Sequence, residues 1–148
     1  MNDIGQLRIY VSDRYFPLYH ELSGNYLFGQ NSEFFIYCVC VGEKYGQKQS
    51  LTKRHELCRA ITLTDYDKTV LKALYVKERK TMAPDAKAAV SLAEEYAEGG
   101  LMHLIEEVLS DHVVVYDDGV YHLKTQDDLE LQMALSEFVL KELREVPF

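Results

Sequence analysis

Residues 94–105, EEYAEGGLMHLI, place two glycines inside the strongest helical pattern of the chain. Apolar residues recur every three or four positions on both sides of the pair without a change of phase, which predicts one long helix or two nearly coaxial halves. Two interior glycines cost about 2 kcal/mol relative to alanine, so some structural gain is expected to offset them. Gly100 lies on the apolar stripe, where a missing side chain lets another helix or a loop approach the backbone closely. The alternative is that Gly99 ends one helix and a tight turn begins another. The stripe consists of Ala86, Val90, Ala93, Ala97, Gly100, Leu101, Leu104, Ile105 and Val108.

The stretch NSEFFIYCVCVGEKYG, residues 31–46, is apolar or aromatic throughout positions 34–41. Such a run fits a buried strand or a buried helix. Asn31 or Ser32 before Glu33 is typical of a helix N-cap, and Gly46 is typical of the residue that follows a helix. We therefore expect a helix, and because it is apolar all round we expect it to be central.

Local signals predict where three of the helices begin. Thr64 precedes DYDKTVLKALYVKER, which has acids at its start and bases at its end, as the helix dipole favours. Pro84 is expected to open the next helix, since proline suits a first turn. Thr125 and Asp128 form a variant of the capping box before the last helix. Its apolar stripe is Leu131, Leu135, Phe138, Val139 and Leu143, and Pro147 closes it.

The β signals are fewer. LRIYV, residues 7–11, alternates like a short strand, and Ser12 is expected to cap a helix that Pro17 either kinks or delays. HELCRAIT, residues 55–62, fits a strand or a helix start. VVVYDDGVYHL, residues 113–123, predicts a hairpin around Asp118-Gly119 that packs on helices or joins the first strand. The predicted fold is mainly α (α+β), a single domain over residues 1–148, with about five helices around a central apolar helix and a small hairpin near residues 113–123.

Composition and charge limit the functional classes. The chain has 148 residues, 47% of them hydrophobic, and no apolar run long enough to span a bilayer. No secretion signal is evident at the start, and the odd set of Cys38, Cys40 and Cys58 suggests reduced thiols, so we expect a cytoplasmic protein without membrane contact. The net charge is −8, which argues against nucleic-acid binding through the overall field.

The charge is unevenly distributed along the chain. Residues 41–83 hold ten Lys/Arg and five Asp/Glu, a net of +5, whereas residues 84–148 hold four and fifteen, a net of −11. Cations beside Tyr45 in the basic segment suit a phosphate backbone and a stacked base. An acidic protein partner and a plain solvated surface fit the same pattern. The cations of this segment are Lys44, Lys48, Lys53, Arg54 and Arg59.

No pattern of catalytic or metal-binding residues emerges. The five histidines form no zinc motif, and His103 with His112 is only a weak metal signal. Adjacent acids such as Glu94/Glu95 and Glu106/Glu107 diverge on a helix, so we interpret them as solvated faces. We therefore predict no catalytic residue, no metal and no cofactor.

Two motifs together carry a family resemblance. FFIYCVCVGEKYGQK is an aromatic helix that runs into Gly-x-Lys-x-Gly, and AEEYAEGGL follows about fifty residues later. Over roughly residues 8–110 the chain resembles the DNA phosphorothioation-associated protein 4 group, small accessory proteins encoded beside bacterial DNA phosphorothioation systems. Similar small subunits accompany other anti-phage operons, including those with an SMC-like ATPase such as Lamassu. The basic pair usual after the second glycine is Gln47-Lys48 here, a departure from the pattern.

The resemblance implies a bacterial anti-phage defence complex and no transferable activity. We therefore predict a non-enzymatic accessory subunit, in a hetero-oligomer with a larger ATPase or nuclease, whose contact with DNA is indirect. The expected partner contacts are Lys44, Tyr45, Gly46, Gly99 and Gly100.

Three other functions remain open. The first is a small DNA-binding module that uses the hairpin as a wing together with Lys48, Lys53, Arg54 and Arg59. The second is a small enzyme, which a bound metal or a deep pocket around His103 or His55 would favour. The third is a regulator whose acidic last helix mimics nucleic-acid charge.

Overall fold

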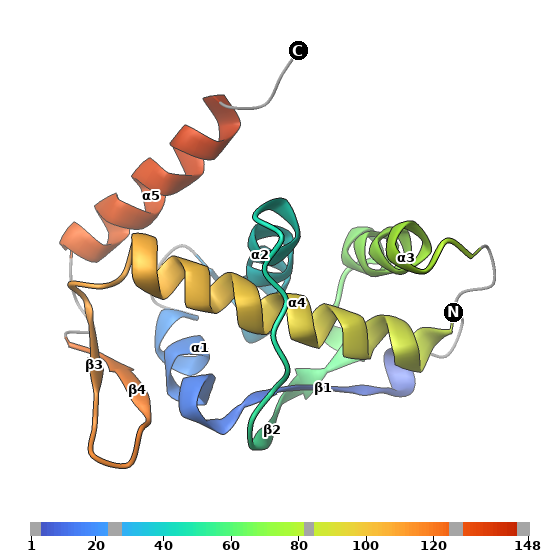
Figure 1. Cartoon of the computed structure of the whole chain (residues 1–148), viewed down its shortest axis with the longest axis horizontal. Coiled ribbons are helices and arrows are strands. Elements are labelled where there is room, and N and C mark those ends of the chain that lie inside the picture. Colours follow the sequence, from blue (N-terminus) through green and yellow to red (C-terminus); the bar gives the residue numbers. More distant parts are fainter. Residues whose placement is uncertain (1–3, 24–27, 82–84, 125–128, 145–148) are drawn as a thin grey trace.

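Helix α4 (Ala86–Glu107) runs along most of the long axis of the molecule and is continuous through both glycines (Figure 1). The prediction of one long helix is confirmed, and a break at Gly99 is wrong. The computed structural model describes residues 4–23, 28–81, 85–124 and 129–144, with backbone only at 143 and 144. The other helices are α1 (Phe16–Leu22), α2 (Asn31–Lys44), α3 (Asp65–Arg79) and α5 (Leu129–Arg144).

Glycines explain how α2 crosses α4 at close range. A Cβ atom on Gly42, Gly99 or Gly100 would lie under 3.0 Å from a backbone atom of the facing segment. Gly42 faces the carbonyl of Tyr96, and Gly100 faces that of Cys38. Only glycine allows backbones to approach this closely. The gain that offsets two interior glycines is therefore the close approach of α4 to α2 at Gly100 and to the segment after α2 at Gly99.

Helix α2 supplies much of the core. Phe34, Phe35 and Cys38 are 0% exposed, which confirms the helical prediction for residues 34–41. Gly46 follows the helix with a φ of 64°, as predicted. The predicted N-cap is wrong by one residue, because Gln30 is the cap and no side chain caps the helix.

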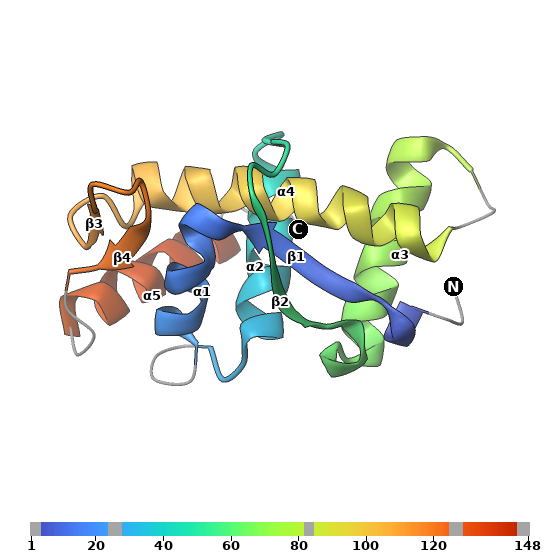
Figure 2. The ribbon, with the colours of Figure 1, turned by 90° about the horizontal axis from the view of Figure 1, so that it is seen from below.

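An antiparallel pair of strands lies below α4 in Figure 1 and in front of it in Figure 2. It joins β1 (Arg8–Ser12) to β2 (Arg54–Arg59), with a register shift between Ile9 and Tyr10. Residues 55–62 thus form a strand followed by a 3-10 turn at Ala60–Thr62, and no helix begins there. A 3-10 turn at Asp13–Tyr15 precedes α1, and Pro17 lies in the first turn of α1, so the helix starts late.

Local capping fixes two helix starts. Thr64 and Asp67 form a reciprocal capping box at the start of α3. Asp85 caps α4 by accepting from the backbone N–H groups of Lys87 and Ala88. Pro84, Pro147 and the predicted capping box at residues 125–128 lie outside the described residues.

The predicted hairpin is confirmed as β3 (Val113–Val115) and β4 (Tyr121–Leu123), with Gly119 at a φ of 82°. It forms its own sheet and packs on α1 rather than joining β1. Glu21 of α1 accepts from the backbone N–H of Leu123 at 2.9 Å. The fold is therefore mainly α with two small antiparallel sheets. No described helix combines the length and apolar character that a membrane span requires.

Candidate functional site

The basic segment is largely neutralised by acids of the same chain. Lys48 of this segment pairs with Glu78 at 2.8 Å, and Arg54 pairs with Glu94 at 3.3 Å. Lys44 and Tyr45 both bond to the Glu142 carboxylate of α5. These pairs reduce the positive charge available to a phosphate backbone.

Lys53 and Arg59 of the same segment differ from these. Both are exposed, and neither forms an ion pair within the described part of the chain. The nucleic-acid prediction for Lys48, Lys53, Arg54 and Arg59 stays a prediction that rests mainly on two cations.

Gly99 and Gly100 are buried in the chain's own core. Gly99 meets the backbone of Gln47, in the segment that crosses α4 after α2. That segment is also held by a backbone hydrogen bond from Gln49 to the carbonyl of Glu95, at 3.1 Å. Because Gly99 and Gly100 are buried, a partner would have to displace α2 or residues 47–49 before it could contact them directly.

Two buried carboxylates join β1 to α4. Glu94 is 5% exposed and accepts from the backbone N–H of Tyr10 at 2.7 Å. Glu98 is 1% exposed and accepts from the hydroxyl of Ser12 at 2.6 Å. Arg14 adds an ion pair to Glu98 at 3.3 Å. The side chain of Ser12 therefore does not cap the following turn, contrary to the prediction, because its hydroxyl donates to Glu98 and accepts from the backbone N–H of Thr52 at 3.0 Å.

The environment of these carboxylates sets their protonation. Burial raises the pKa of Glu94 to about 7 and also raises the pKa of Glu98, because the charged form loses its hydration. The interpretation of Glu94 as a solvated residue is wrong. Its spacing of four from Val90 and from Glu98 places it beside the buried stripe, a signal that the sequence did contain. Since donors from β1 occupy both carboxylates, we assign them a structural role.

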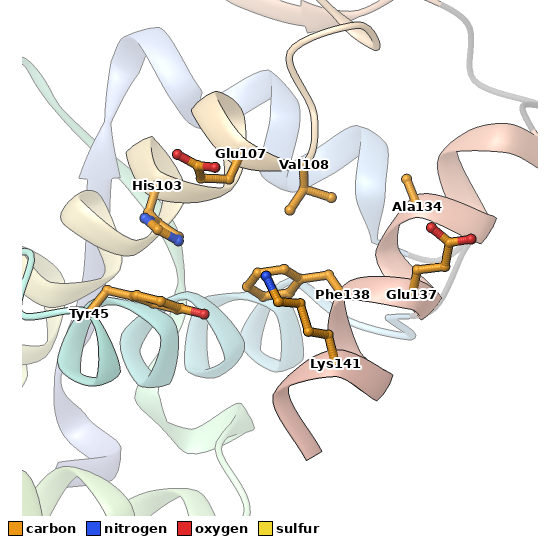
Figure 3. A pocket seen from close by; sticks show the side chains of 8 residues that line it. All are labelled: Tyr45, His103, Glu107, Val108, Ala134, Glu137, Phe138 and Lys141. Atoms are coloured by element: carbon orange, nitrogen blue, oxygen red, sulfur yellow. The ribbon is translucent and has the colours of Figure 1, made fainter. Parts of the chain in front are cut away.

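A surface hollow of about 350 Å³ separates the end of α4 from α5 (Figure 3). The ring of His103 stacks on Tyr45, with centroids 4.0 Å apart and planes 20° apart. Gln47 lies 3.4 Å from Nδ1 of His103. We call this the aromatic hollow. Its lining consists of Tyr45, His103, Glu107, Val108, Ala134, Glu137, Phe138 and Lys141.

The aromatic hollow contains acid–base groups but lacks the other parts of a hydrolytic site. No serine, threonine or cysteine lines it. His112, the proposed companion of His103 in a metal site, is not among the lining residues. Across the described ranges, no three His, Cys, Asp or Glu side chains are grouped as metal ligands.

A second hollow of about 270 Å³ lies on the other flank of Phe138 and includes Tyr37 and Cys40. Leu131 and Leu135 of α5 are 0% exposed, so the helix is seated on the body through them. Beyond these leucines the packing opens on both sides of Phe138. Figure 1 shows the later part of α5 extending away from the other helices.

The outward face of α5 is apolar. Leu129, Met133 and Leu140 are 70%, 53% and 52% exposed. At 100° per residue they fall within about 40° of one another, roughly opposite Leu131 and Leu135. We call these three residues the outer stripe. The inner stripe of this helix was predicted from the sequence. The outer stripe was not predicted, although its spacing of four and seven residues is present in the sequence.

No family model matches the chain, nor does any curated protein or solved structure. The resemblance over residues 8–110 therefore stays an expectation drawn from the two motifs.

Proposed function

We propose that this protein is a non-enzymatic accessory subunit that binds a larger protein through α5. The outer stripe is the observation that carries the proposal. Large apolar side chains that line up on a helix and stay in water mark an interaction surface more often than a free one. Burying one leucine fully is worth about 1.5–3 kcal/mol, so covering this stripe offers a substantial driving force.

The setting of the proposed subunit comes from the two sequence motifs. Their resemblance to phosphorothioation-associated accessory proteins supports a cytoplasmic anti-phage complex with an ATPase or nuclease as the larger protein. In this arrangement DNA is contacted by the larger protein. Lys44 and Tyr45, two of the expected contacts, bond to Glu142 of α5, so in this proposal they hold α5 on the body of the protein.

The DNA-binding alternative has less support. Arg54 is paired with Glu94, and its guanidinium carbon lies 4.5 Å from the centre of the Tyr10 ring. Lys48 is paired with Glu78. A phosphate would have to compete with these internal partners.

Affinity purification tests the proposal. The protein carries a tag before residue 1 and is expressed from its own locus in its host, and the co-purifying proteins are identified by mass spectrometry. We expect one larger protein in stoichiometric amount, lost from the Leu140→Glu variant. Tyr66→Ser is the matched control, since Tyr66 is 77% exposed on α3. A protein that elutes alone, or whose partner is retained equally by Leu140→Glu, would contradict the proposal.

A further inference from the structure

One flank of the outer stripe is acidic. Glu130 and Glu137 are exposed and lie about 80° to 100° from Leu129 around the helix, and the exposed Lys141 lies on the same flank at about 120°, so two carboxylates share this flank with one ammonium group. The other flank carries Gln132 and Ser136, which are uncharged. Glu137 also lines the aromatic hollow, so the acidic flank is the one that turns toward α4.

The end of α4 extends this acidic edge. Glu106 and Glu107 are exposed there, as is Asp111 in the turn that follows. Glu107 lines the aromatic hollow from α4 and Glu137 lines it from α5, while the ammonium group of Lys141 points toward Phe138 (Figure 3). Carboxylates from two separate elements therefore border one hollow.

The interior of the hollow suits a cation. Its charged side chains are two carboxylates and the ammonium of Lys141, a net of −1 when histidine is left out of the count. Tyr45 and Phe138 add aromatic faces, which attract cations. A guanidinium group fits this combination well, because it stacks on rings and binds carboxylates with two parallel hydrogen bonds.

The same charges argue against a second copy as the occupant. Residues 84–148 carry a net charge of −11. Pairing two copies through α5 would bring two acidic edges together, and like charges across an interface disfavour a pairing. A basic partner gains from the same field.

We infer that the outer stripe and the aromatic hollow together bind one amphipathic helix of the partner, whose apolar face is flanked by arginine or lysine. The apolar side chains cover Leu129, Met133 and Leu140, and one long cationic side chain reaches across the acidic flank into the hollow. In this binding mode one helix packs against another. The apolar contacts provide affinity, and the charged flanks determine which partner binds. The inference rests on the proposed function and specifies the chemistry of the partner's contact.

Two labelled synthetic peptide helices test the inference by fluorescence anisotropy. They share one leucine stripe and differ only in their flanks, which are arginine in one and glutamate in the other. We expect the arginine helix to bind at least about tenfold tighter, with the difference shrinking as salt rises. Leu140→Glu is expected to weaken both, and Tyr66→Ser is expected to change neither.

Reversing the charges that border the hollow tests whether these carboxylates choose between the two peptides. The double variant Glu107→Lys with Glu137→Lys is expected to reverse the preference between the two peptides. Circular dichroism and an unchanged unfolding midpoint confirm that each variant is folded.

Three outcomes would overturn the inference. Equal binding of both peptides, still dependent on Leu140, rejects the basic partner and leaves the proposed function standing. Peptide binding that does not weaken when Leu140 or Met133 is substituted rejects the proposed binding surface. Concentration-dependent dimers that dissociate on Leu140→Glu, seen by light scattering, assign the stripe to a second copy. Failure of the proposed function is recognised separately, by the absence of a stoichiometric partner in the affinity purification.

Discussion

The α2–α4 crossing and the attachment of α5 use opposite packing solutions within one small chain. At the crossing, Gly42 and Gly100 let the backbones of α2 and α4 come into contact, and Gly99 lets the backbone of Gln47, just after α2, come equally close to α4. Along α5, hollows of about 350 and 270 Å³ remain on the two sides of Phe138. The crossing has no room for a methyl group, whereas α5 keeps apolar surface in water. The difference indicates that the crossing fixes the fold and that α5 is the element left available for binding.

The largest expected effect is at the crossing. Gly100→Ala adds a Cβ under 3.0 Å from the carbonyl of Cys38. Alanine is the better helix former by about 1 kcal/mol, yet we expect a net loss of about 3 kcal/mol or more in the free energy of unfolding, because rigid backbone cannot yield. Urea unfolding measures it. Ser91→Ala on the exposed face of α4 is the control, and a stable Gly100→Ala protein would show that the crossing is not tight.

The second effect concerns pH at the β1–α4 contact. The folded pKa of Glu94 is raised to about 7 from an ordinary 4.5, so the folded state binds more protons than the unfolded state between these values. The contribution of Glu94 to stability is therefore fully present below about pH 4.5 and is lost as pH rises to about 7.

The Glu94→Gln variant removes this titration. We expect the free energy of unfolding of the natural chain to fall, relative to Glu94→Gln, by on the order of 2 kcal/mol between pH 5 and pH 8. Glu106→Gln, an exposed residue of the same helix, serves as the control. Parallel pH profiles for the natural chain and Glu94→Gln would show that Glu94 stays ionised and that its burial is fully compensated.

A smaller effect is expected where α5 meets the body. Phe138→Ala removes a half-buried ring between two hollows, so we expect a loss of about 1 kcal/mol, below the usual cost for a fully buried phenylalanine. Hydrogen exchange should accelerate in residues 129–142 and stay unchanged in α2 and α4. Faster exchange throughout the chain would mean that α5 is part of the same cooperative unit, and the contrast between the two regions would fail.

The smallest effect on stability is expected on the outer stripe. Leu140 is 52% exposed, so Leu140→Ser should change the free energy of unfolding by less than about 0.5 kcal/mol. The same substitution is expected to release the partner in the affinity purification. Thermal unfolding and the amount of partner retained give the two readouts. A large loss of stability would show that Leu140 supports the fold, and the outer stripe would then need another explanation.

Several features were predictable because they depend on neighbours in the sequence. The phase of the stripe across Gly99 and Gly100 predicted one helix, and Asp118-Gly119 predicted the hairpin turn. Thr64 with its following acids predicted the start of α3. Each of these rests on backbone preference or on spacing within one or two turns, which the chain encodes locally.

Other features depended on partners far along the chain. Residues 55–62 fit a strand or a helix until β1 supplied strand partners 44 to 51 residues away, from Val11 opposite His55 to Arg8 opposite Arg59. Ser12 had the residue type of a cap, but its hydroxyl accepts from the backbone N–H of Thr52 and donates to Glu98. Glu94 had the composition of a surface residue, but β1 covers it. The spacing of Glu94 placed it beside the buried stripe, but whether a polar group there loses its water depends on what packs over it, and only the position of β1 decided that.

The sequence by itself determined the helices, the hairpin turn and the need for a close approach at Gly100, because periodicity and glycine geometry are properties of the chain alone. The tertiary structure decided which backbone approaches Gly100, which carboxylates lose their water, and which face of α5 stays exposed. These outcomes depend on contacts between segments distant in sequence, where the free energy of burial is set by the whole packed arrangement.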